Sequence, residues 1–171
     1  GSAGRRAQAE ERVLSLAAAE GTLADLALEL EDALEDPATN RDAVRNALVK
    51  IYTRALDTFG ATEVLMAYAR EPGREVDAWR EIARMHLLAE EYRKHERALR
   101  RLLDLDPAAE LEYLQQLALS ALERGRPALA RDVAEELLER EATAEAFEFA
   151  TGIHALASRD RETVRIHRRF L

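Results

Sequence analysis

Residues 79–107, with the sequence WREIARMHLLAEEYRKHERALRRLLDLDP, decide the fold of this chain. Apolar side chains recur every three or four positions on both sides of the polar pair Glu90-Glu91, which is the period of amphipathic helices. Asp106-Pro107 closes the stretch, because proline cannot continue a helix and often opens the next one. We therefore expect two short helices joined by a tight turn, and such helices pack antiparallel.

The same periodicity extends in both directions, and no stretch shows the alternation of a half-buried strand. Gly21, Gly60 and Gly125 are expected to end helices in left-handed conformations, and Thr22 and Asn40 to act as N-caps. Ten helices are predicted, near residues 7–19, 23–35, 40–57, 61–71, 75–88, 91–104, 108–123, 127–139, 143–157 and 160–170.

The turns inside successive helix pairs recur at a nearly constant interval. Gly21, Gly60, Glu90, Gly125 and Arg159 are separated by 39, 30, 35 and 34 residues, close to the roughly 34 residues of a tetratricopeptide repeat. The family's pattern of a large aromatic residue, a leucine-small pair, an aromatic residue, a turn and a closing leucine-aspartate-proline is matched in residues 79–107. The residues that match it are Trp79, Ile82-Ala83, His86, Glu90 and Leu105-Asp106-Pro107.

The chain thus resembles the tetratricopeptide repeat family over about residues 8–171, most closely at residues 75–140. The resemblance implies an all-α fold, a right-handed α–α superhelix (a solenoid) of about five antiparallel helix pairs. Residues 1–6 are interpreted as a cloning scar or flexible leader, and residues 7–171 as one repeat array, a fragment of a longer chain. His95 stands where the family prefers alanine, and Arg168 where it prefers a large apolar residue. The second helix of the fifth pair is therefore either a packed repeat helix or a solvated end helix.

Small and large residues have different expected roles in such an array. Small residues let neighbouring helices approach closely, and large ones fill the remaining space. The small residues in question are Ala83, Ala118, Ala130, Ala134 and Gly152, and the large ones are Trp79, Leu99, Leu102, Leu117 and Leu137.

Composition excludes several functions. The 171 residues contain no cysteine, so a disulfide framework or a thiolate site is excluded. A net charge of −8 argues against nucleic-acid binding. No apolar run is long enough for a membrane span, and no signal peptide is apparent, so a cytoplasmic location is expected. Only Lys50 and Lys94 are lysines among 25 basic residues, and this arginine bias favours a bacterial source.

No catalytic constellation is present in the sequence, and we predict that the chain is not an enzyme. No phosphate-binding loop or nucleophile elbow occurs. The four histidines, which do not share helical spacing, are His86, His95, His154 and His167. We expect no metal and no cofactor.

The family resemblance places the first helix of each pair on a concave inner face. The inner positions change along the chain from basic to apolar, which predicts a groove for a protein or peptide with acidic and apolar residues. The basic section is Lys50, Arg54, Arg80 and Arg84, and the apolar section is Leu87, Gln115, Leu119, Leu122, Phe149, Ile153 and Leu156. Two simpler interpretations stay open: neighbouring carboxylates such as Asp57, Asp77 or Glu81 pair with the basic residues, and further chain covers the apolar ones.

Two functions follow from the sequence. The first is a non-catalytic protein–protein interaction scaffold that binds a partner's peptide or helix in the groove. Arg54 and Arg84 stand where some family members hold a peptide carboxylate with asparagine, so that type of clamp is not supported. The alternative is an assembly module that self-associates end to end, because residues 1–40 are acidic and residues 159–171 contain five arginines. A homo-oligomer is its expected form.

Overall fold

The computed structural model describes the backbone of residues 2–36 and 38–170, and side chains of residues 8, 9, 11–36 and 38–158. Within those residues every regular element is helical: nine α-helices and one short 3-10 turn. The chain divides into two compact units, Gly1–Glu90 (unit 1) and Glu91–Leu171 (unit 2). The all-α prediction is confirmed for this part of the chain. The boundary falls at the turn inside the predicted third repeat.

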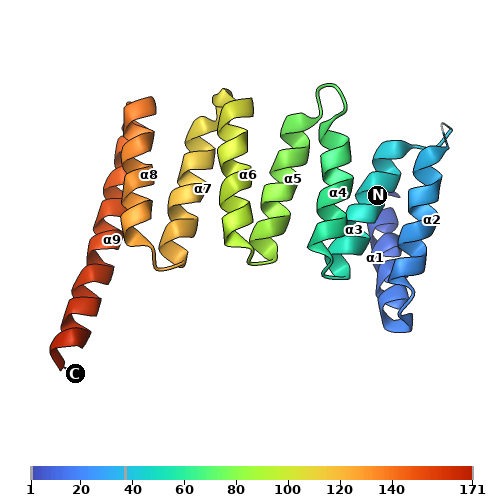
Figure 1. Ribbon diagram of the computed structural model, residues 1–171, viewed down its shortest axis with the longest axis horizontal. Helices are drawn as coiled ribbons and strands as arrows, with labels where there is room; N and C mark the ends of the chain where they lie inside the picture. Colours follow the sequence, from blue (N-terminus) through green and yellow to red (C-terminus); the bar gives the residue numbers. More distant parts are fainter. Residues whose placement is uncertain (1, 37, 171) are drawn as a thin grey trace. The chain divides into compact units, whose positions relative to one another are not determined.

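Unit 1 consists of five helices, each of which packs against the next in sequence (Figure 1). They are α1 (Ser2–Glu20), α2 (Leu23–Glu35), α3 (Arg41–Arg54), α4 (Thr58–Ala69) and α5 (Glu75–Leu88). Leu14, Ala27, Leu48 and Ile51 form a buried cluster where α1, α2 and α3 meet. The first helix begins earlier than its predicted range, inside the segment interpreted as a leader.

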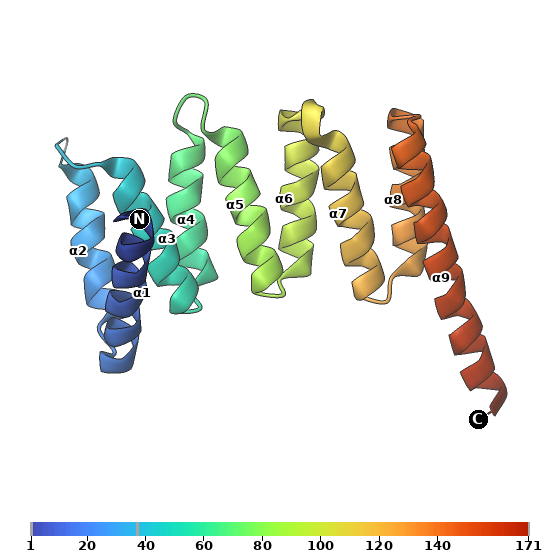
Figure 2. The same ribbon diagram turned by 180° about the vertical axis from the view of Figure 1, so that it is seen from behind.

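Unit 2 has four α-helices, and its third, α8, packs between its neighbours α7 and α9 (Figure 2). The elements are α6 (Tyr92–Leu105), the 3-10 turn η1 (Pro107–Ala109), α7 (Glu110–Glu123), α8 (Pro127–Arg140) and α9 (Ala144–Phe170). The hydroxyl of the buried Tyr113 donates to Asp106 Oδ2 at 2.9 Å and so ties α7 to the end of α6.

The predicted fifth helix pair is wrong. Residues 143–157 and 160–170 were expected to be separate helices with a turn at Arg159, whereas α9 is continuous from Ala144 to Phe170. Neither glycine nor proline occurs near Arg159, and arginine, aspartate and glutamate are all tolerated inside helices. Equal spacing of turns therefore predicted a break that no local signal supports. The side chains of Arg159 and Arg168 lie outside the described residues.

Helix ends follow the predicted glycines only in part. Gly21 and Gly125 have φ values of +75° and +64°, as expected. Gly60 lies inside α4, and the left-handed residue before that helix is Leu56, with φ of +58°. A Cβ on Gly60 would lie 2.8 Å from ring carbons of Tyr52, so this glycine is needed for close packing instead.

The predicted N-caps also differ. Asn40 Oδ1 accepts from the amide of Ala43 at 3.1 Å and caps α3 as expected. Thr22 precedes α2, but its side chain makes no capping bond. Its hydroxyl is directed to the carbonyl of Ala17, at the end of α1. The cap of α4, which the sequence analysis missed, is Asp57, which accepts from the amide of Gly60 at 2.9 Å.

Packing agrees with most of the expected small and large positions. The four predicted alanines and four predicted leucines are buried. Gly152 is exposed, so it does not serve close helix approach, and Trp79 is only half-buried.

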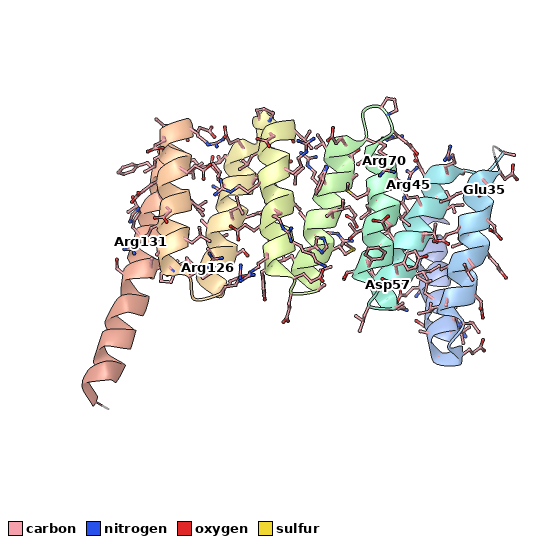
Figure 3. The ribbon with its side chains drawn as sticks, in the orientation of Figure 1. Glu35, Arg45, Asp57, Arg70, Arg126 and Arg131 are labelled. Carbon is pink, nitrogen blue, oxygen red and sulfur yellow. The ribbon has the colours of Figure 1, made fainter. Side chains whose placement is uncertain are left out.

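A buried arginine, not anticipated from the sequence, fastens α3 to α4 (Figure 3). Arg45 is 5% exposed, and it donates to Asp42 at 2.7 Å and to Glu71 at 2.9 Å. Its guanidinium carbon also lies 3.7 Å from the ring centroid of Tyr68. Two carboxylates and an aromatic face thus compensate the loss of its hydration.

Candidate functional site

Three of the four predicted basic residues meet at one pocket in unit 1. Its volume is about 390 Å³. Lys50 and Arg54 come from α3, and Arg84 comes from α5. Lys50 and Arg54 share one face of α3 because they are four positions apart. Arg80 is exposed on α5 but does not line this pocket. The other lining residues are Glu11, Leu14, Asn46, Val49, Thr53, Leu65 and Glu81.

Arg54 connects α3 to α1. Its guanidinium donates to Ser15 Oγ at 2.9 Å and forms an ion pair with Glu11. The Glu11 side chain is 60% exposed, so solvent screens this ion pair and weakens it. Asp57, the neighbour proposed as a partner from sequence, instead caps α4.

Arg84 lies beside a carboxylate of its own helix. Its Nε donates to the two carboxylate oxygens of Glu81 at 3.1 and 3.0 Å. This hydrogen bonding is the main reason that the pKa of Arg84 is raised, while burial acts in the opposite direction. The pairing of Arg84 with Glu81 is one of the simpler interpretations that the sequence left open.

The pocket therefore combines three cations with two carboxylates above an apolar floor. Exposed ion pairs of this kind contribute only about 0–1 kcal/mol each. An incoming carboxylate can replace Glu11 or Glu81 at little cost, because it accepts the same guanidinium donors.

Several lining residues were missed by sequence reasoning. Asn46 lies one turn before Lys50, so its spacing alone could have added it to the site. Glu11 is far from Arg54 in sequence, and only the packing of α1 on this side of α3 brings the two together. No sequence signal marks that contact.

The predicted apolar section is distributed between the units and is not uniformly exposed. Leu87, at the end of α5 in unit 1, is 39% exposed. In unit 2, Leu119 and Leu156 are 45% and 48% exposed, respectively, and Gln115, Leu122 and Phe149 are half-buried.

Ile153 was predicted to line the apolar section of the groove, but it is buried. It is 2% exposed and belongs to the core of unit 2, because α9 packs on both α7 and α8. Phe147 and Phe149 are two positions apart on α9, so they face in different directions. Neither is fully buried, and Phe147 is the more exposed of the two.

The described side chains offer no group of three histidine or acidic residues arranged to hold a metal ion. In the same part of the chain, no helix has the length and apolar character needed to cross a membrane.

Comparison with known proteins leaves the family open. No protein-family model matches the chain, and no curated protein matches it. The resemblance to tetratricopeptide repeats thus rests on the residues quoted above.

Proposed function

We propose that the chain is a tetratricopeptide-like right-handed solenoid that acts as a non-catalytic protein-interaction scaffold. It binds a partner segment with acidic and apolar residues. The pocket formed by Lys50, Arg54 and Arg84 is the observation that carries this proposal, because it gathers cations on a protein with net charge −8. Its arginines would bind a carboxylate through paired donors, and Leu14, Val49 and Leu65 would accept an adjoining apolar side chain.

The test uses a defined set of fluorescein-labelled peptides that carry one or two acidic residues beside apolar ones. Fluorescence anisotropy with the full chain measures the dissociation constant at low and high ionic strength. We expect the tightest binder to weaken as salt increases, and Lys50→Glu/Arg84→Glu to abolish its binding.

Arg80→Glu is the matched control for Arg84→Glu alone, because each makes one charge reversal on α5 and only Arg84 lines the pocket. Its effect should be small. Equal binding by the wild type and the folded double variant would exclude the pocket as the site. Equal losses in these two single variants would reduce the effect to net charge.

A further inference from the structure

Unit 1 contains a second depression, formed by α1, α2 and α3. It comprises two adjoining pockets of about 440 and 430 Å³ that share Val13 and Leu26. The first extends to Leu30 and Lys50, and the second to Leu16. Leu14 and Lys50 also line the basic pocket. We call the two together the α1–α2 furrow.

The furrow presents aliphatic surface to solvent. Val13 and Leu16 are 54% and 55% exposed, whereas the residues that directly follow them on the same helix, Leu14 and Ala17, are buried. Exposed apolar side chains that adjoin one another around a depression are typical of a surface that binds another molecule.

The outer part of the furrow is acidic. Glu20, at the end of α1, and Asp25 and Glu29, on α2, line the second pocket, and no described basic residue lines it. The charge of the second pocket and the aliphatic residues that line both pockets therefore favour a cationic amphipathic occupant, with its cations at the second pocket.

The chain itself contains a segment of that chemistry. Residues 159–171 hold five arginines and two acidic residues. Ile166 and Phe170 are four positions apart, and the backbone of α9 is helical as far as Phe170, so this spacing places the two on one helix face. The side chains of this segment lie outside the described residues.

We propose that the α1–α2 furrow of one copy binds residues 159–171 of a second copy. Ile166 and Phe170 occupy the apolar floor, and the arginines pair with Glu20, Asp25 and Glu29. Donor and acceptor surfaces differ, so the contact is head-to-tail and each added copy leaves one of each free. This inference gives a site to the assembly function. It does not rest on the function proposed for the basic pocket, and the second pocket of the furrow shares no lining residue with that pocket.

Sedimentation velocity of the full chain over a range of concentrations tests the proposal. We expect the average mass to exceed the 19.2 kDa of one copy as concentration rises, and to fall toward it at high ionic strength. Val13→Asn/Leu16→Asn should weaken association about tenfold or more, because polar amides replace the apolar floor without adding charge. Both sites are exposed, so the fold is expected to survive, and circular dichroism verifies this.

Leu28→Asn is the control for replacing an exposed apolar side chain by an amide. Leu28 is 61% exposed on α2 and lines neither pocket, so this variant should associate as the wild type does. A wild type that stays monomeric at every concentration would overturn the proposal. Association unaffected by the furrow variant would do so as well, because the contact would then lie elsewhere.

A charge exchange identifies the contacting groups. Glu20→Arg/Glu29→Arg and Arg165→Glu/Arg169→Glu should each lose self-association, and their mixture should regain it. The mixture pairs each reversed surface with an opposite charge. A mixture that stays monomeric would contradict direct contact between the furrow and the C-terminal segment.

Discussion

The α1–α2–α3 region of unit 1 and the α7–α8–α9 region of unit 2 pack in different ways. Ala118, Ala130, Ala134 and Ala146 are fully buried in the second region, where short side chains bring helix backbones close together. In the first region Val13 and Leu16 are exposed beside a furrow. The three pockets described above all belong to unit 1. Close approach through alanine fills a helix interface, whereas large side chains without a facing helix leave apolar surface exposed.

Enlarging one alanine in each region tests whether free space differs between the two. Ala134→Leu adds volume where none is free and should lower the free energy of unfolding by about 3 kcal/mol. Ala47→Leu, which projects toward an existing pocket, should leave it unchanged or raise it slightly. Urea denaturation measures both. Similar losses in the two variants would show that the furrow is not usable space.

The stability gained from an ion pair should also differ between the units, because Arg45 in unit 1 is buried and Arg100 in unit 2 is more exposed. Arg45→Met removes two hydrogen bonds made by a side chain that is 6% exposed. It should lower the free energy of unfolding by about 2 kcal/mol. Arg100→Met in unit 2 removes a pair with Glu136 in which the arginine is 40% exposed, and should cost less than about 1 kcal/mol. Thermal unfolding of both variants gives the comparison. Equal shifts in Tm would mean that burial of Arg45 adds nothing to the pair.

Corresponding turns provide a sharper test. Leu56, before α4, and Gly125, before α8, share the left-handed conformation, which costs an L-residue roughly 1 kcal/mol. Leu56→Gly should therefore raise the stability of unit 1, and Gly125→Ala should lower that of unit 2, each by about 1 kcal/mol. No neighbouring atom obstructs a Cβ at Gly125. The stability lost in Gly125→Ala therefore measures the cost of the left-handed backbone conformation alone. Chemical denaturation that moved both variants in one direction would refute this account.

The smallest expected effect concerns Tyr52. Its hydroxyl donates to Glu31, which is the main cause that raises its pKa from 10.0 to about 12, with burial second. The unfolded phenol loses its proton first, so the stability from this bond is present below pH 10 and is lost as pH rises through about 12. Ultraviolet titration of the wild type and of Tyr52→Phe should assign a late-titrating phenol to Tyr52, and Glu31→Gln should move its pKa toward 10. An unchanged pKa in that variant would remove Glu31 as the cause.

Local signals in the sequence were sufficient for most elements of the fold. Apolar spacing, Asn40, Pro107 and two glycines predicted α2 to α8 to within about three residues at each end. The failure at Arg159 arose because the repeat interval was given more weight than the missing helix-breaking residue. Gly60 failed for a related reason, since glycine serves close packing as well as turns.

The candidate site was less accessible from sequence. Helical spacing brought Lys50 and Arg54 to one face correctly, but it did not reveal Glu11 across from them. Ile153 was assigned to the surface by analogy between repeats, whereas α9 buries it. Periodicity gives the relative directions of side chains on one helix, and the neighbouring helix decides which direction is covered.

By itself, the sequence determined an all-helical chain with short turns, an acidic first part and an arginine-rich last part, because these depend on residues close together in the chain. Only the tertiary structure decided that Arg45 is buried, that Arg54 pairs with Glu11, and that α1 leaves the furrow open. Those outcomes require contacts between distant residues, whose free energies depend on how closely the helices approach.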